Sequence, residues 1–366
     1  MGEPIRILHR VVNMNRGGAE TLIMNIYRNI DRERIQFDFL ISNTGVFDDE
    51  IRSLGGRIYQ IPYINKSGPF KYTRDVYRFF KEHNEYKIVH SHMDRMSGLI
   101  MREAKRAGVP VRIAHSHNTQ SQGNLFVKAV KRYYSFWLKD ATDCLACSQA
   151  AAKAMFPEKD VTVIKNGIDV NKFSFNEEIR DKIRRRYSIS DKLVLGNVAR
   201  FEVQKNHEFL IDIFSEVHEI NKNSVLILVG KGRLEKDIQD KVRIYGLENA
   251  VIFMGSRQDV HELVQAFDVF VFPSLFEGLP VALLEAQAAG LRCVVSDTIT
   301  KEADITGNVE FVSLKKSAGY WADLIVKCSD YERKNADGLI KGGEFDIVHT
   351  AELLANFYLS KMKNIC

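Results

Sequence analysis

The sequence predicts an α/β protein made of two Rossmann-like domains, whose parallel sheets are covered by helices and face each other across a cleft. Short apolar runs rich in β-branched residues alternate along the chain with longer amphipathic stretches, as in strand–helix–strand units. The length of 366 residues exceeds what one core usually holds and suits two domains. We expect domains over residues 1–170 and 171–348, with the helical segment 349–366 packed back on the first domain.

The first domain is expected to begin with a strand over residues 5–12, a Gly-rich loop over 13–18 and a helix over about 19–29. Strand, Gly-rich loop and helix form an arrangement that can cradle phosphate. The remaining elements of this domain are expected at 37–41, 57–61, 87–90, 111–114, 143–146 and 161–169 for strands and turns, and at 70–83 for a helix.

The second domain repeats this rhythm. Strands are expected at 193–198, 224–229 and 251–254, and helices at 208–219, 234–245 and 260–266. The last predicted helix, 349–362, carries an apolar stripe made of Leu353, Leu354, Phe357 and Tyr358.

One strand–turn–helix unit of the second domain organises the prediction of function. The apolar run 270–272 ends at Pro273, which suits a buried parallel strand. Pro280 fits the first turn of a helix, residues 281–289 are helix formers, and Gly290 is a natural stop. The N-terminus of this helix therefore lies at the carboxyl end of the strand, the edge at which α/β proteins hold phosphorylated ligands.

Two carboxylates flank that turn, Glu277 in the loop and Glu285 in the helix. Free N–H groups suit a diphosphate and Glu carboxylates suit sugar hydroxyls, so together they point to a nucleotide-sugar. The alternative is an ordinary strand–helix unit with a solvated Glu in its loop.

Composition and cysteine content indicate a soluble protein of a reducing compartment, expected in the cytoplasm at the inner face of the membrane. No apolar run approaches the roughly 18–20 residues of a membrane span. Charged residues interrupt the early apolar segment, so we expect no signal peptide. The five cysteines make no disulfide framework, and Cys144 and Cys147, three apart on a predicted strand, are expected to be buried small hydrophobes.

The charge is uneven along the chain. Up to Val170 there are 26 Lys+Arg against 18 Asp+Glu, a net +8, and the remainder has 26 against 29, a net −3. A basic first half suggests an anionic partner. No recognition helix, zinc finger or aromatic-basic sheet motif supports nucleic acid, so an anionic membrane or a phosphorylated acceptor is expected instead.

The segment 124–139 is the candidate membrane surface. Its apolar stripe on a helical wheel consists of Phe126, Val130, Tyr133 and Trp137. Its basic residues are Lys128, Lys131, Arg132 and Lys139. Such a helix can rest on an anionic leaflet near a lipid-linked acceptor. A core helix with snorkelling lysines is the alternative.

Two His-Ser-His motifs, His90–His92 and His115–His117, lie at the ends of predicted neighbouring strands. Alternate strand positions share a face, so four imidazoles could assemble there. A zinc site is one interpretation. Without carboxylate or thiolate ligands nearby, we expect His92, His115 and His117 to line the acceptor site instead.

An ordered series of motifs resembles the retaining glycosyltransferases of family 4, and among them the capsule and exopolysaccharide enzymes of the GT-B fold. The resemblance spans roughly residues 5–296 and is strongest after Asp169. The motifs that carry it are Arg16-Gly-Gly-Ala-Glu20, Val163-Ile-Lys-Asn-Gly-Ile-Asp169, Gly196-Asn-Val-Ala-Arg200 with Lys205, Leu228-Val-Gly-Lys-Gly232, Phe253-Met-Gly-Ser-Arg-Gln-Asp-Val260, and the pair Glu277 and Glu285.

The resemblance assigns roles to these residues. Glu277 would bind hydroxyls of the donor sugar and Glu285 the nucleotide ribose. Arg200 and Lys205 would lie on the donor diphosphate, and Arg257 would border the base.

In the first domain, Gly17 and Gly18 would let the loop approach the diphosphate or the acceptor. His117 would face the reacting sugar, and His115 is the alternative for that role. Pro280 departs from the Gly of many members and supplies no N–H. Further donor contacts are expected at Gly230, Gly278, Leu279 and Val281.

The resemblance also implies a chemistry that needs no cofactor and no metal, with a nucleotide-sugar as donor, which we expect to be a UDP-sugar. The acceptor would be a glycan or a polyprenyl-diphosphate-linked sugar. Cations and helix N–H groups would stabilise the leaving diphosphate, with Arg200 and Lys205 in place of Mg²⁺. The alternatives are a nucleotide-sugar epimerase or hydrolase of the same fold, and a non-catalytic nucleotide-sugar-binding subunit.

Overall fold

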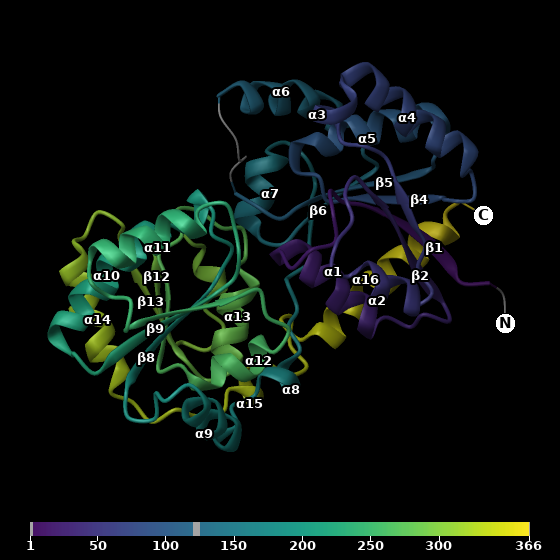
Figure 1. The fold of residues 1–366 in the computed structure, drawn as a ribbon. Helices are drawn as coiled ribbons and strands as arrows, with labels where there is room; N and C mark the ends of the chain where they lie inside the picture. The colour runs from purple at the N-terminus through teal and green to yellow at the C-terminus, as the bar shows by residue number, and fades with distance from the viewer. Residues whose placement is uncertain (1–2, 120–124, 366) are drawn as a thin grey trace. The chain divides into compact units, whose positions relative to one another are not determined.

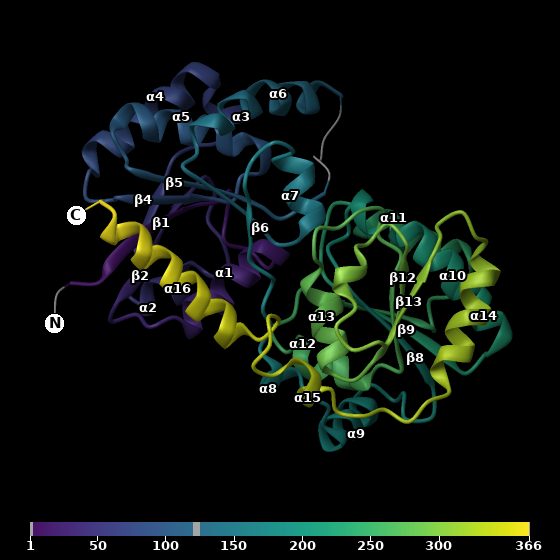
Figure 2. The same cartoon turned by 180° about the vertical axis from the view of Figure 1, so that it is seen from behind.

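The structure, a computed structural model, describes residues 3–119 and 125–365, without the side chains of Leu125 and Phe126. It divides into two compact units (Figures 1 and 2). Unit 1 comprises Met1–Gly167 with Ile347–Cys366, and unit 2 comprises Ile168–Asp346. Among the described residues, no helix is both long and apolar enough to cross a bilayer.

Within its described residues, unit 1 contains a sheet of seven parallel strands in the order β3-β2-β1-β4-β5-β6-β7. The strands are β1 (Ile5–Arg10), β2 (Ile35–Ile41), β3 (Ile58–Gln60), β4 (Ile88–Ser91), β5 (Val111–Ser116), β6 (Asp143–Ala146) and β7 (Thr162–Val163). The order reverses between β1 and β4, which places the carboxyl ends of β1, β4 and β5 side by side in the middle of the sheet.

Helices cover both faces of this sheet. One face carries α1 (Gly18–Asn29), α2 (Asp48–Ser53) and the C-terminal α16 (Ile347–Lys363). The other carries α3 (Ile64–Ser67), α4 (Pro69–Glu82), α5 (Ser97–Ala107), α6 (Leu125–Ser135) and α7 (Gln149–Met155), with 3₁₀ helices η1 (Asp94–Met96) and η2 (Phe136–Asp140). Both faces are thus buried, as expected of a parallel sheet.

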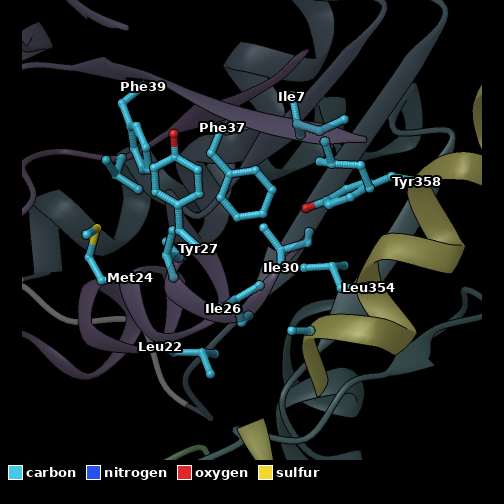
Figure 3. Packing of buried hydrophobic residues seen from close by; sticks show 14 of the residues in the cluster. Ile7, Leu22, Met24, Ile26, Tyr27, Ile30, Phe37, Phe39, Leu354 and Tyr358 are labelled. Carbon is cyan, nitrogen blue, oxygen red and sulfur yellow. The ribbon is translucent and has the colours of Figure 1, made fainter. Parts of the chain in front are cut away.

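The core beneath α1 joins the two ends of the chain. Tyr358 and Leu354 of α16 pack with Ile7 and Phe37 of the sheet and with Ile26 of α1 (Figure 3). Tyr358 is fully buried, although it lies some 350 residues after the first strand. The last helix is therefore an integral part of unit 1.

Unit 2 contains, in its described residues, a sheet of six parallel strands in the order β10-β9-β8-β11-β12-β13. The strands are β8 (Leu193–Val198), β9 (Ser224–Val229), β10 (Val251–Gly255), β11 (Val269–Phe272), β12 (Arg292–Ser296) and β13 (Val309–Val312). Here the order reverses between β8 and β11, so the loops that follow these two strands lie together.

Helices α10 (His207–Ile220), α11 (Glu235–Ile244) and α14 (Ala318–Ser329) bury one face of this sheet. Figure 1 shows α12 (Val260–Leu263) and α13 (Val281–Ala288) on the opposite face. The remaining short helices are α8 (Val170–Phe173), α9 (Glu177–Arg186), α15 (Asp337–Ile340), η3 (Val203–Lys205), η4 (Val264–Ala266) and η5 (Lys301–Ala303).

The predicted fold class of two parallel-sheet α/β domains is confirmed, and the strands expected at 143–146, 193–198 and 224–229 have the predicted bounds. Two details are wrong. Pro280 is the N-cap of α13 rather than a residue of its first turn, because its ψ of 112° is extended and the helix begins at Val281. The continuous helix expected over 124–139 ends at Ser135 and continues as the 3₁₀ helix η2.

Candidate functional site

The loop between β11 and α13 holds the acidic pair at the carboxyl edge of the unit 2 sheet. β11 lies between β8 and β12 and is buried along its length. Glu277 is 5% exposed and Glu285 is 9% exposed. Carboxylates are rarely buried to this degree unless paired or functional, so both positions need a partner from the protein or from a ligand.

Lys205 is the partner of Glu277. Its Nζ donates to Glu277 Oε1 at 2.6 Å and lies 5.0 Å from the centre of the Phe272 ring. Both side chains are largely buried, so this is a desolvated ion pair with little screening by solvent. The two residues are 72 positions apart in the sequence. They meet because β8 and β11, the strands that precede their loops, are neighbours in the sheet.

Hydrogen bonds hold the two loops against each other. Gln204 accepts from the Leu275 N–H at 2.8 Å through its carbonyl oxygen, and its Nε2 donates to the Phe276 carbonyl at 2.7 Å. Asn206 Nδ2 donates to the Pro273 carbonyl at 3.1 Å. These contacts hold the residues on both sides of Lys205 against the loop that follows β11.

The protonation of Glu285 is governed by its burial. Burial raises the pKa of the Glu285 carboxyl to about 8, and Lys172 opposes this shift. The free protein therefore holds Glu285 largely as the neutral acid near pH 7. A neutral buried acid can donate to a ligand oxygen or, once ionised, accept from ligand hydroxyls.

The other predicted donor residues of unit 2 follow the ends of neighbouring strands. Arg200 is exposed two residues after β8. Gly230, directly after β9, has a φ of +147°, and a Cβ there would lie 1.9 Å from the Ala199 carbonyl oxygen. Only glycine permits this close approach of the two loops. Arg257, after β10, makes two hydrogen bonds to Asp259, at 2.8 and 2.6 Å.

The Gly-rich loop of unit 1 leads into α1. Gly17 is the N-cap of this helix, and no side chain caps it there. A Cβ on Gly17 would lie 2.2 Å from Glu20 Oε2, whereas one on Gly18 would meet nothing within 4 Å. The carboxylate of Glu20 thus lies over the first turn of α1, where the helix dipole favours negative charge.

Five imidazoles gather on one face of the unit 1 sheet. His9 of β1 pairs in register with His90 of β4, and His92, His115 and His117 follow at alternate positions on β4 and β5 or just beyond them. Alternation places all five on the face that α1 and α16 cover. The predicted meeting of the two His-Ser-His motifs is confirmed, and His9 is an addition that the sequence analysis missed.

Direct contacts link the five rings into two chains. In the first, His92 lies between His9 and His117, with nitrogen–nitrogen distances of 3.0 Å (His9 Nδ1 to His92 Nε2) and 2.8 Å (His92 Nδ1 to His117 Nε2). In the second, His90 Nε2 is 3.0 Å from His115 Nδ1, and His90 Nδ1 is 2.6 Å from the Tyr358 hydroxyl.

All five imidazoles are neutral at physiological pH. Burial lowers the pKa of His9 to about 3 and that of His117 to about 4, and it lowers the pKa values of the other three well below the usual range. The neighbouring rings add to the shift in His90, His92 and His115, because two adjacent imidazoliums would repel. A neutral imidazole has one lone pair free to accept a hydrogen bond or bind a metal ion.

The candidate membrane helix buries part of its apolar stripe. Val130 and Trp137 pack on the core beneath α4 and α5, and the Arg102 guanidinium lies 4.4 Å from the Trp137 ring. Tyr133, whose ring centre is 4.9 Å from that of Trp137, is 64% exposed, while Tyr134 is buried. The side chain of Phe126 lies outside the described residues.

An amphiphilic surface remains on this segment. Its exposed aromatic residues are Tyr133 and Phe136, and its exposed basic residues are Lys128, Arg132 and Lys139. Lys131 does not belong to it, because its ammonium is 3.0 Å from Asp94 and largely buried. We call the five exposed residues the α6 surface.

The predicted Cys144 and Cys147 pair is buried and not disulfide-bonded. Cys144 packs in the core beneath α4 and α5. The prediction of small buried hydrophobes is confirmed for both.

Comparison with known proteins gives matches along most of the chain. Residues 16–172 match the family model described as Glycosyltransferase Family 4, and residues 192–330 match that of Glycosyl transferases group 1. "Putative glycosyltransferase EpsF" of Bacillus subtilis is 40% identical over 336 residues, 88% of this chain and 88% of that protein. "Capsular polysaccharide biosynthesis glycosyltransferase CapH" of Staphylococcus aureus is 28% identical over 378 residues, 98% and 99% of the two chains.

A third relative has a name that states its substrates. The "UDP-Gal:alpha-D-GlcNAc-diphosphoundecaprenol alpha-1,3-galactosyltransferase" of Escherichia coli is 26% identical over 387 residues, 98% of each chain. Among solved structures, Anabaena Alr3699/HepE in complex with UDP and glucose has a TM-score of 0.81 at 20% identity, over 97% of this chain and 100% of that chain. WaaG, a glycosyltransferase involved in lipopolysaccharide biosynthesis, has a TM-score of 0.71 at 15% identity, over 96% and 95%. At these identities the two structures show that the fold is shared.

Proposed function

Because the chain belongs to the glycosyltransferases of family 4, we propose that it transfers a sugar from a UDP-sugar to a glycan or polyprenyl-diphosphate-linked acceptor, with retention at the anomeric carbon. The product would enter surface polysaccharide synthesis. The names of CapH and of the Escherichia coli galactosyltransferase support the pathway, the donor and the acceptor.

The observation that carries this proposal is the buried contact between Lys205 and Glu277. Both reach the carboxyl edge of the sheet at the strand-order reversal, where phosphorylated ligands bind in open α/β sheets. A cation fixed at that edge suits a diphosphate, and the carboxylate beside it suits the hydroxyls of the attached sugar.

The proposed reaction follows from these charges. The bond between the anomeric carbon and the phosphate oxygen breaks, and a bond from the acceptor oxygen to the same face of that carbon forms. The acceptor's proton passes to the leaving phosphate oxygen. Lys205 and Arg200 would stabilise the negative charge that develops on the diphosphate, so no metal is required there.

The remaining predicted residues fit around this step. Glu285 would hold the ribose hydroxyls, and Arg257, already ordered by Asp259, would border the base. His117, half-buried at the end of its histidine chain, would face the reacting sugar. Gly17 and Gly18 would let the backbone of unit 1 approach the donor or the acceptor.

A donor screen tests the proposal. Protein stripped with EDTA is melted with UDP-, GDP- and ADP-sugars, and we expect UDP-sugars to raise the melting temperature, because a ligand stabilises the folded state it binds. Transfer to a lipid-linked acceptor is then followed by NMR, and the new linkage should keep the anomeric configuration of the donor. Turnover of the donor without acceptor would favour an epimerase or hydrolase, and tight binding without product for any acceptor would favour a binding subunit.

We also propose that the α6 surface rests on an anionic membrane near a lipid-linked acceptor. Exposed aromatic rings beside basic side chains are typical of helices that lie in the interface. Each Lys or Arg near an anionic leaflet contributes about 1 kcal/mol to binding. The double variant Lys128→Glu/Arg132→Glu is therefore expected to bind anionic vesicles at least about tenfold more weakly.

Cosedimentation with phosphatidylglycerol vesicles measures this effect. The matched control is Arg185→Glu/Arg186→Glu, which makes the same charge change at two exposed positions of α9 and should bind like the parent. Lys131 is left intact because its replacement would also break its contact with Asp94. Equal binding of parent and α6 variant would sink the membrane assignment.

A further inference from the structure

The histidine chains of unit 1 leave ring nitrogens without hydrogen-bond partners. These are His9 Nε2, His115 Nε2 and His117 Nδ1, each buried. A buried polar atom without a partner costs on the order of 1–3 kcal/mol. Three of them in one cluster are unusual in a protein interior, where buried polar groups are nearly always satisfied.

Counting protons shows why the rings alone cannot resolve this. Neutral His9, His92 and His117 carry one N–H each on six ring nitrogens. Their two contacts use four nitrogens and two protons. The third proton lies on one of the two outer nitrogens, His9 Nε2 or His117 Nδ1. That nitrogen is an N–H without an acceptor, and the other outer nitrogen is a lone pair without a donor. No choice of tautomers in this chain satisfies both ends.

The geometry points to a ligand that takes lone pairs instead. We propose that His92, His115 and His117 bind one divalent transition-metal ion, with Zn²⁺ as the first candidate. One ring nitrogen from each lies within 4.8 Å of the others. The set includes His115, whose Nε2 is orphaned, and its other two members are half-buried and so reachable by an ion, which makes it a better fit than the alternative set of His9, His90 and His92.

The spacing needs little change to accept the ion. Zn–N bonds of about 2.0–2.1 Å in tetrahedral geometry separate ligand nitrogens by about 3.3 Å. The His92 and His117 nitrogens are 2.8 Å apart, so they would move apart by about half an ångström. A small cavity of about 10 Å³ lined by the five rings, Leu22 and Leu354 leaves slack for this movement.

The surroundings have the features of a metal site. His90 and the buried Tyr358 hydroxyl behind it hold the ring of His115 from its other nitrogen, as outer partners of metal-binding histidines do. His92 and His117 are only half-buried, which leaves an entry path. An all-imidazole set suits Zn²⁺, Cu²⁺ or Ni²⁺ and disfavours Mg²⁺ and Ca²⁺, which prefer oxygen ligands.

This inference goes beyond the proposed transfer reaction, in which the diphosphate is held by cations of unit 2. It is compatible with the role proposed for His117, because an ion bound to His117 Nε2 leaves the Nδ1–H to face the sugar. Its measurement uses neither donor nor acceptor, so its failure and that of the transferase proposal are separate results.

Calorimetry on the full chain tests it directly. The protein carries no histidine tag, is stripped with EDTA and is titrated with Zn²⁺ and, in parallel, with Mg²⁺. We expect one Zn²⁺ per chain and no heat from Mg²⁺. Co²⁺ in place of Zn²⁺ should give the visible absorption bands of a tetrahedral ion.

Variants locate the site. His117→Gln, at a half-buried position, and His115→Gln are each expected to weaken Zn²⁺ binding by more than about 100-fold, because removing a ligand costs more than the 10–100-fold of an outer partner. His349→Gln replaces an exposed histidine of α16 and should bind like the parent. Melting curves without metal identify any variant that fails to fold, and His117→Gln alone then decides. Absence of saturable Zn²⁺ binding, or binding unaffected by His117→Gln, would overturn the proposal.

Discussion

Replacing Lys205 by Met is expected to lower kcat for sugar transfer by about 10²–10³-fold, the usual effect of removing one preorganised group that stabilises developing charge. The ammonium is largely buried, and the residues on both sides of it are hydrogen-bonded to the loop that follows β11, whereas Arg200 on the same loop is exposed. Its loss would leave the departing diphosphate less stabilised and would remove the cation that lies 2.6 Å from the buried Glu277 carboxylate.

Because Lys205 and Glu277 form an ion pair, the kcat of the Glu277 variant and of the double variant is also informative. Glu277→Gln keeps the shape of the side chain but removes its charge, and the double variant tests whether the two groups act as one unit. We expect the double variant to be little worse than either single variant, because each loss already disables the pair. Lys236→Met on the exposed face of α11 is the matched control and should keep parental kinetics. Unchanged kcat in Lys205→Met would remove this residue from the reaction.

Replacing Glu285 by Gln is expected to make the protein more stable above neutral pH and to flatten the pH dependence of its stability. The carboxyl has a pKa of about 8 in the folded chain and an ordinary value of 4.5. Between these values the folded state keeps a proton that the unfolded state has released. The stability of the parent therefore falls as pH rises through this window, by up to about 1.4 kcal/mol per pH unit. Gln has no proton to lose and shows no such fall.

Urea unfolding of both proteins at pH 5, 6.5 and 8 measures the effect. The gap between Glu285→Gln and the parent should widen in favour of the variant at each step. Glu248→Gln, at an exposed position, controls for the loss of one charge and should run parallel to the parent. A constant gap between parent and Glu285→Gln would show that this carboxyl is already ionised in the folded protein.

The strand–helix alternation was readable from the sequence because buried parallel strands are short apolar runs, and most of the predicted elements have nearly the predicted bounds. The strands and helices at the end of unit 2 could not be predicted from the sequence. β13 is only partly buried and four residues long, and with β12 and α14 it lies at or after the point where the family motifs stop. A short, half-exposed strand carries too weak a pattern to be separated from a loop.

The chemistry of individual residues was readable, but their partners were not. The His-Ser-His motifs could be paired because they end successive strands, whereas His9 joins them only because β1 is the neighbour of β4. The contact of Lys205 with Glu277 likewise depends on strand order. In the α6 segment, the change to a 3₁₀ helix at Phe136 alters the angular step between residues, so a single helical wheel does not describe the residues after Ser135.

The chain leaves unit 1 at Gly167 and returns to it at Ile347, with a whole folded unit inserted between. During synthesis, unit 2 is thus the first part whose residues are all available, while one face of the unit 1 sheet is covered only by α1 and α2 until α16 is made. Only when α16 leaves the ribosome can Leu354 and Tyr358 close that face, so the earlier-made half is the later one to be completed. Nascent chains stalled before Ile347 should for this reason depend on chaperones more than the finished protein does.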